Sequence, residues 1–239
     1  MAIDSAALTA SLRRLAERGT DSSDVVSALT DVVNACVDLF GVTGSGIMLA
    51  DEQNVSRYVT ASNGPGRVME TAESETGQGP CTEAFVDNRS VGITDVTAES
   101  RWPDLAAAVA PFGVRAVLGV PVQLGAVTVG TLDVYRDHPH EWHESEHVAL
   151  ARYSKVVGAT LTTALAAHAA GELANQLQYA LDYRVAIERG IGFLMARDGI
   201  DGVTAFNRLR RSARNSRRKI GEISEYLLAQ GQLPDPPRP

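Results

Sequence analysis

The chain has 239 residues, of which 44% are hydrophobic and 21% charged, a composition typical of a globular protein with one large domain or two unequal ones. No segment approaches the ~20 consecutive apolar residues of a membrane span. The first residues lack the basic start and apolar core of a signal peptide, so we expect a cytoplasmic protein with no membrane partner. Two cysteines, Cys36 and Cys81, are too few for a disulfide framework or a four-thiolate zinc site.

The net charge of −7 is distributed unevenly along the chain. Between Arg184 and Lys219 there are ten basic and three acidic residues, whereas the rest of the chain has 12 basic and 26 acidic ones. This asymmetry predicts two modules with different partners, and the basic module can neutralise phosphates. A solvated helical surface is the alternative explanation of the basic segment.

The first third of the chain predicts two helices followed by two strands. Apolar residues recur at helical spacing over Ser5–Arg18 and again over Ser22–Phe40. Ile47–Ala50 and Ser56–Ala61 then read as antiparallel strands joined by a polar hairpin. The glycines and proline at 64–66 and the acidic stretch after them predict a loop or a short helix.

The middle of the chain mixes short helices with strands. Helices are expected over Thr82–Val86 and Trp102–Ala110, and a short strand over Ser90–Ile93. The two clearest strands are Ala116–Leu124 and Val127–Tyr135, which a tight turn of small residues joins. Because the strands are linked by hairpins, we predict an α+β fold with an antiparallel sheet and helices packed on it.

From Glu144 to Leu227 the chain is predicted to be mainly helical. No proline interrupts the pattern from Glu144 to Met195, so we expect one long connecting helix, whose alanine-rich seam predicts a homodimer, with core packing as the alternative. A second helix begins near Asp201, a good N-cap, and a third carries Ile220–Leu227. The proline-rich tail, 232–239, is expected to be disordered.

Two segments carry recognisable motifs. The segment from Leu177 to Leu228 contains Ala180-Leu181-x-x-Arg184-x-x-Ile187, Gly192 to Ile200 and Ala205 to Ser212. With these stretches it resembles an ANTAR domain, the RNA-binding three-helix module of bacterial antitermination regulators. The upstream segment contains Gly79 to Ala84, Trp102-Pro103, Gly113 to Val117, Val120 to Val122 and Gly130 to Tyr135. With these it resembles a GAF domain, and the order of both segments is similar to the GAF–ANTAR regulators of actinobacteria.

The resemblance implies four segments and a function. These are a leader helix (1–20), a GAF-like sensor (21–168), an ANTAR-like domain (169–231) and the tail (232–239). The ANTAR-like domain is expected to bind tandem hairpins with six-nucleotide loops in nascent RNA and to promote antitermination. An unidentified small molecule or protein would signal through the sensor, and a shift of conformation or oligomeric state would expose the basic face.

The basic residues near the second C-terminal helix are the candidate RNA contacts. One side of a helix, opposite Phe206, Leu209 and Ala213, is expected to carry a polar stripe. Its members, at spacings of three or four, are Asn207, Arg210, Arg211, Arg214 and Arg218. Such a stripe can follow a phosphate backbone and contact bases exposed in loops. Asn215-Ser216 is an alternative start for a new helix. The full set of candidates is Arg184, Gly192, Asn207, Arg210, Arg211, Ser212, Arg214, Asn215, Arg217, Arg218 and Lys219.

One departure from the ANTAR pattern favours a different function. Where these domains commonly have Ala-Lys-Gly, this chain has Gly190-Ile191-Gly192, so an apolar residue replaces the lysine. The alternative is a ligand-binding or dimerisation adaptor whose ANTAR-like tail no longer binds RNA.

The sensor pocket is expected around Cys81, Trp102 and Phe112. The cyclic-nucleotide motif Asn-Lys-x-x-x-Phe-Asp-Glu is absent, and Cys81 lacks the adjacent histidine of bilin-binding relatives, so no cofactor is predicted. A structural role for Cys81 is favoured over a redox-active one.

Neither a metal site nor an enzyme is predicted. His138, His140, His143 and His147 form a dense cluster, but Pro139 interrupts it and a turn before a helix explains it. No Ser-His-Asp order, P-loop, His-Glu-x-x-His or kinase motif is present.

Overall fold

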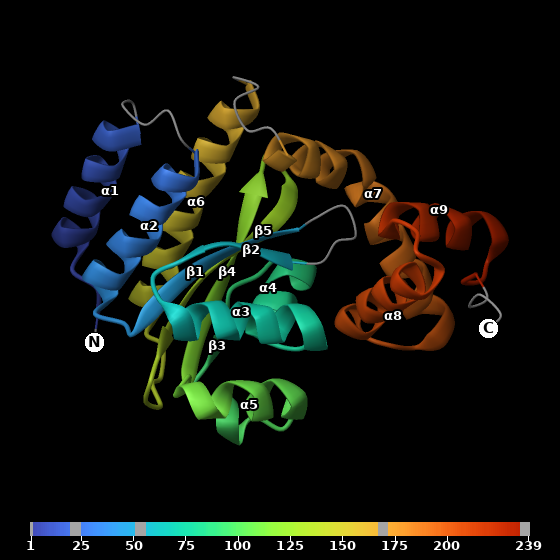
Figure 1. The fold of residues 1–239 in the computed structure, drawn as a ribbon, viewed down its shortest axis with the longest axis horizontal. Coiled ribbons are helices and arrows are strands. Elements are labelled where there is room, and N and C mark those ends of the chain that lie inside the picture. Colours follow the sequence, from blue (N-terminus) through green and yellow to red (C-terminus); the bar gives the residue numbers. More distant parts are fainter. Residues whose placement is uncertain (1, 20–24, 51–55, 167–171, 235–239) are drawn as a thin grey trace.

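The computed structural model describes residues 2–19, 25–50, 56–166 and 172–234 (Figure 1). The N-terminal part contains helices α1 to α6 around a sheet, and the C-terminal part contains helices α7 to α9. The elements in chain order are α1 Ser5–Gly19, α2 Val25–Phe40, β1 Gly44–Ala50, β2 Ser56–Ala61, α3 Gly64–Thr76, α4 Pro80–Asp87, β3 Val91–Ile93, α5 Pro103–Val109, β4 Ala116–Leu124, β5 Val127–Arg136, α6 Glu144–Ala166, α7 Glu172–Asp198, α8 Gly202–Ser216 and α9 Ile220–Gln230.

The sheet is antiparallel throughout, with the strand order β2-β1-β5-β4-β3. Strand β5 is central, and its Leu132 pairs with Ile47 of β1 on one side and with Val120 of β4 on the other. The predicted α+β architecture is confirmed. The expected hairpin turn between β1 and β2 lies at 51–55, outside the described residues.

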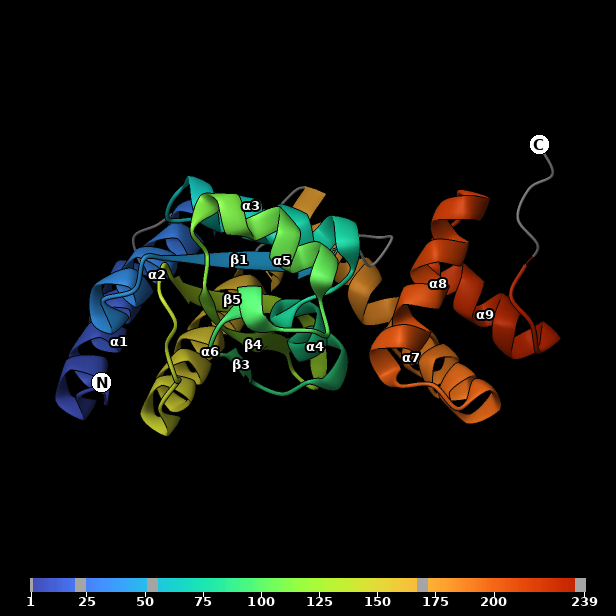
Figure 2. The same cartoon turned by 90° about the horizontal axis from the view of Figure 1, so that it is seen from below.

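Helices cover both faces of the sheet (Figure 2). On one face, α1, α2 and α6 bury a core that includes Leu29, Leu150 and Leu132. On the other face, α3, α4 and α5 pack over Val117 and Tyr135. This alternation follows from the strand period of two, which points successive residues of β5 to opposite helical layers.

Helix α3 is longer than the sequence indicates, because the expected loop or short helix is a helix of 13 residues. The side chain of Asn63 caps it by accepting the N–H of Gly66, and Pro65 occupies the first turn, where its missing N–H costs no hydrogen bond. The helix ends at Gly77, whose φ of 67° is the left-handed conformation that favours glycine.

The stretch from Glu144 to Met195, where one long helix is expected, is helical on both sides of the residues that the structure leaves out. The first helix, α6, ends at Ala166, and the second, α7, begins at Glu172, with 167–171 outside the described residues. They run in different directions in Figure 1, and the 27-residue α7 leads into the C-terminal unit. The three helices α7 to α9 lie at one edge of the sensor, beside α4.

The C-terminal helices share a core with the sensor. Ile187, Leu209 and Ile223 come from α7, α8 and α9, and Phe85 of α4 belongs to the same buried cluster. Leu233 also packs against it, so the tail that was expected to be disordered is partly ordered up to Pro234. None of the described helices has the length and apolarity that a membrane crossing requires.

Candidate nucleic-acid interface and sensor core

Helix α8 carries most of the candidate RNA contacts. Asp201 begins it as the predicted N-cap, accepting the N–H of Thr204 at 2.7 Å. Phe206, Leu209 and Ala213 form its buried face. These apolar residues and the arginines between them lie on different sides of the helix, so α8 is amphipathic. Its polar side is therefore available for contacts outside the core of the C-terminal helices.

The basic run does not continue along one helix. Arg217 adopts a left-handed conformation with a φ of 54° and ends α8, and Lys219 is the N-cap of α9. Arg218 therefore lies in the turn, where its guanidinium contacts Glu222 at 3.3 Å. The expected single stripe from Asn207 to Arg218 is thus interrupted after Ser216.

An exposed groove runs along the C-terminal half of α8. It has a volume of about 280 Å³, and Leu233 and Pro234 form its far wall. The hydroxyl of Ser212 is buried there, and no group in the described part of the chain hydrogen-bonds to it. We call this feature the basic groove; its lining residues are Arg208, Arg211, Ser212, Asn215, Ser216, Leu233 and Pro234.

The arginines around this groove are exposed. Within the described part of the chain, Arg211, Arg214 and Arg217 make no ion pair, whereas Arg208 pairs with Asp198 at 2.7 Å. These three cations are therefore available to an anionic partner without first breaking an internal contact.

Other candidates face the sensor instead of solvent. Arg210 is 3% exposed and its Nη2 donates to the carbonyl of Ser74 at 2.7 Å. Asn207 donates from Nδ2 to the carbonyl of Gly77 at 2.8 Å. Arg184 is also buried, with its guanidinium 4.9 Å from the ring centre of Phe85.

The glycine-rich stretch of α7 divides between core and surface. Ile191, in the position of the usual lysine, is 8% exposed and belongs to the C-terminal core. Gly190 lies against α9, because a Cβ there would be 3.1 Å from the Cβ of Ser224. Gly192, the candidate contact, is exposed.

The three expected sensor-pocket residues occupy three different environments. Cys81 is 1% exposed and faces the sheet beside Gly119. Trp102 lines a hollow of about 410 Å³ between the sensor and the start of α8. Phe112 is half exposed at the surface. They do not line one cavity.

A cluster of buried carboxylates lies at the centre of the sensor, and sequence reasoning missed it. Glu70 and Glu73 of α3 face Asp133 of β5, and all three are at most 1% exposed. Among the described residues, both oxygens of Glu70 and Oδ2 of Asp133 find no hydrogen-bond partner. We call these three residues the acid cluster.

Glycines on neighbouring strands make room for the acid cluster. Gly46 of β1 and Gly119 of β4 are the register partners of Asp133 on its two sides. A side chain at Gly46 would overlap the carboxylate of Glu70. The row Gly-Asp-Gly across three strands is the signal that could have located the cluster, but it becomes visible only once the register is known.

The environment of the acid cluster favours its protonated forms. Burial raises the pKa of Glu73 to about 7. The hydrogen bonds that Glu73 accepts from the N–H groups of Cys81 and Thr82 act in the opposite direction and lower this pKa, but by less. Burial and the charges of neighbouring carboxylates raise the pKa values of Glu70 and Asp133. Burial and the charge of Glu73 raise the pKa of the Cys81 thiol, which disfavours the reactive thiolate.

The histidines form separate contacts. His140 lies 3.0 Å from the carboxylate of Glu146, and His147 lies 2.7 Å from the hydroxyl of Ser90. Among the described residues, no three His, Cys, Asp or Glu side chains are grouped as a metal site would require.

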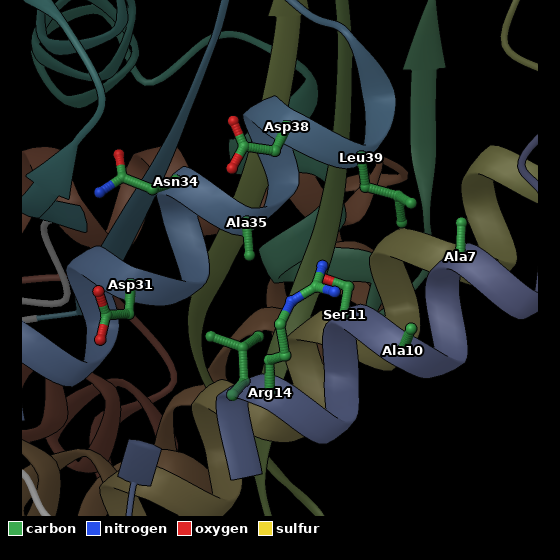
Figure 3. Close-up of a pocket in the computed structure, with 10 residues that line it drawn as sticks. Ala7, Ala10, Ser11, Arg14, Asp31, Asn34, Ala35, Asp38 and Leu39 are labelled. Carbon is green, nitrogen blue, oxygen red and sulfur yellow. The ribbon is translucent and has the colours of Figure 1, made fainter. Parts of the chain in front are cut away.

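A further hollow, of about 420 Å³, lies between α1 and α2 (Figure 3). Asp31, Asn34 and Asp38 line it from α2, and Arg14 reaches into it from α1. It lies on the opposite side of the sheet from the acid cluster, because α1 and α2 cover the other face.

Two family models match this chain. The GAF domain model matches residues 24–173 and the ANTAR domain model matches residues 175–228. The chain therefore belongs to the GAF domain family. Its particular form is a GAF domain followed by a C-terminal ANTAR domain, the architecture of an RNA-binding antitermination regulator.

Solved structures support the fold of the sensor. The chain is similar to the GAF domain of a phosphoenolpyruvate-protein phosphotransferase from Acinetobacter, with 19% identity, a TM-score of 0.53 and coverage of 67% of this chain and 96% of the other. It is also similar to the free methionine-R-sulfoxide reductase from Neisseria meningitidis in complex with its substrate, with 21% identity, a TM-score of 0.53 and coverage of 67% and 92%. No curated relative matches the chain.

Proposed function

We propose that the protein binds tandem stem-loops in nascent RNA through the basic groove and promotes antitermination under control of its GAF domain. The observation that carries this function is the exposed set Arg211, Arg214 and Arg217, which has no internal ion pairs within the described residues. Guanidinium groups bind phosphate in bidentate geometry and also stack on unpaired bases.

The shape of the groove suits a looped-out nucleotide. Arg211 and Asn215 supply hydrogen-bond donors along one wall, and Leu233 and Pro234 supply an apolar wall on the other. Sequence-specific RNA recognition commonly uses unstacked loop bases held by such mixed surfaces. The hydroxyl of Ser212, buried without a partner among the described residues, adds a donor and acceptor inside the groove.

Binding to RNA tests this function. The probe is a labelled RNA with two tandem hairpins and six-nucleotide loops, titrated at several salt concentrations. The double variant Arg211→Ala with Arg214→Ala should bind at least tenfold more weakly and lower the slope of log K against log salt by about two. The same RNA placed before a terminator should give increased readthrough with the wild-type protein only.

The matched control is Arg13→Ala with Arg67→Ala, which removes one exposed arginine from α1 and one from α3. This control should bind as the wild type does. Arg210 is left intact because its substitution would also remove a contact with the sensor. Affinity equal to that for an unrelated duplex, or equal loss in both double variants, would overturn RNA recognition by the groove.

An adaptor without RNA binding is the second candidate. Two observations favour it. Ile191, in the position where ANTAR domains commonly have lysine, is buried in the C-terminal core. Arg210 is engaged in a hydrogen bond with the sensor. In that case the C-terminal helices would serve association only, and the salt titration above would show no specific binding.

We propose a homodimer in the cytoplasm as the working form. Helix α7 supports association because Val185 and Met195 are 54% and 40% exposed on it. Exposed apolar residues on a helix that leads into an output unit are suited to pairing with a second copy.

A further inference from the structure

The polar side of α8 makes specific contacts with the sensor. Asn207 and Arg210 donate to the carbonyl groups of Gly77 and Ser74, at 2.8 and 2.7 Å. Both carbonyls belong to the last turn of α3 and its C-cap. Two candidate RNA contacts are therefore engaged by a second domain of the same chain.

The chemistry of this contact favours a cation. The final carbonyls of a helix have no partner within the helix, and they lie at the negative end of its dipole. The guanidinium of Arg210 satisfies the carbonyl of Ser74 at that end of α3. A phosphate oxygen of RNA would offer the same guanidinium a comparable hydrogen-bond acceptor. Arg210 can therefore bind either the sensor or an RNA backbone through the same kind of contact.

Apolar contacts accompany the hydrogen bonds. The rings of Phe206 and Phe85 lie 5.9 Å apart, and the guanidinium of Arg184 lies over Phe85. At the start of α8, a Cβ on Gly202 would be 3.5 Å from Cγ1 of Val86. We call the sensor residues Ser74, Gly77, Phe85 and Val86 the docking surface.

We propose that the docking surface competes with RNA for the polar side of α8, so that the docked form binds RNA weakly and release from the sensor increases affinity. This regulation rests on the RNA-binding function proposed above. The competition follows because Arg210, 3% exposed, and Asn207 cannot contact RNA while they hold the carbonyls of α3.

The size of the effect depends on how much of the protein is released. The apparent dissociation constant equals the intrinsic constant divided by the released fraction, so a protein that is 10% released binds about tenfold more weakly than a fully released one. Because the competitor is part of the same chain, its effective concentration is high without any external inhibitor.

A disulfide across the interface tests the competition in the full chain. Val86→Cys and Gly202→Cys are chosen because a Cβ on Gly202 would lie 3.5 Å from Cγ1 of Val86, about where the sulfur of Val86→Cys would be, and neither position is a candidate RNA contact. The native cysteines are buried and free, so they do not compete in forming it. The oxidised double variant should bind the tandem-hairpin RNA at least tenfold more weakly than the same protein after reduction.

The single variant Val86→Cys, given the same oxidant and reductant, should bind equally in both states. In the opposite direction, Phe85→Leu removes the ring contacts with Phe206 and Arg184 but keeps an apolar side chain, and it should tighten RNA binding at least threefold.

The outcomes separate the two proposals. Equal affinity of the oxidised and reduced staple, with RNA bound in both, overturns the competition and leaves the RNA-binding function standing. Binding no better than to an unrelated duplex in every form, including the reduced staple and Phe85→Leu, overturns the RNA-binding function and the competition with it.

Discussion

Arg210 and Arg211 are adjacent in the sequence and have opposite environments. Arg210 is buried against the sensor, whereas Arg211 lines the basic groove. In the structure Arg214 is exposed, whereas the guanidinium of Arg210 lies 5.8 Å from the ring centre of Phe206. Helical spacing predicts that Asn207, Arg210 and Arg214 share one polar side of α8. It contains no information about which part of that polar side a second domain will cover, and this is why the candidate contacts divide into two groups.

The acid cluster shows a different limit of sequence reasoning. Carboxylates are normally exposed, so Glu70 and Glu73 indicated a solvated loop or short helix. In the structure they face inward over Gly46, because the glycine leaves space above the sheet. Their burial depends on the pairing of β1 with β5, which joins residues more than 80 positions apart.

The raised pKa of Glu73 predicts that stability falls as pH increases. Its pKa is about 7 in the folded protein and near 4.5 as the usual value, so between these pH values the folded state binds more protons than the unfolded state. The contribution of Glu73 to the free energy of unfolding should therefore fall by about 3 kcal/mol from pH 4.5 to 7. Glu70 and Asp133 change in the same direction. Urea unfolding at a series of pH values measures this dependence of the free energy of unfolding on pH.

Two variants assign this effect. Glu73→Gln cannot ionise at this position, so its free energy of unfolding should fall by about 3 kcal/mol less than that of the wild type over the same pH range. The fall that remains in this variant comes from Glu70 and Asp133. Glu75→Gln, an exposed neighbour on α3, should follow the wild-type curve. A Glu73→Gln curve parallel to the wild type would contradict the assignment.

At the scale of elements, the sequence predicts a helix or strand correctly where its local signals agree, and less well where they conflict. The N-cap at Asp201 and the long strands β4 and β5 were predicted correctly, because capping and alternation act over a few residues. Helix α3 was underestimated because Gly64 and Pro65 are usual helix breakers. Here they form its first turn, where Asn63 provides the cap.

The cap of α8 gives a prediction at this scale. Asp201 accepts hydrogen bonds from the N–H and the hydroxyl of Thr204, at 2.7 and 3.0 Å. Asp201→Ala should lower the free energy of unfolding by about 1 kcal/mol, whereas Asp201→Asn retains the acceptor and should cost much less. Urea unfolding followed by circular dichroism compares them. Equal losses in both variants would show that the cap does not stabilise α8.

At the scale of the whole molecule, the sequence predicts two modules but not their arrangement. The two sets of motifs identify a GAF and an ANTAR segment, and the family models match both. Their contact depends on Phe85 of α4, which belongs to the same core as Leu209 and Ile223. No periodicity within α4 distinguishes a residue buried inside its own domain from one buried against another.

Association of two copies is tested through α7. Val185→Glu places a charge at the exposed apolar position, and it should convert a dimer into a monomer in sedimentation experiments at micromolar concentration. Val26→Glu, at a position of similar exposure on α2, is the matched control and should remain dimeric. Dimers in both variants would place the interface elsewhere, and monomers in the wild type would contradict the homodimer.

Helix α3 connects the acid cluster with the docking surface through adjacent residues. Glu73 points into the acid cluster, and the next residue, Ser74, presents its carbonyl to Arg210. Hydrogen bonds of 2.7 to 2.8 Å are largely lost beyond about 3.5 Å, so a displacement of this turn by less than about 1 Å is enough to break them. The acid cluster and the contact with Arg210 are thus separated by a single peptide unit of α3. A small movement of this turn at the acid cluster is therefore enough to break the hydrogen bonds that hold α8.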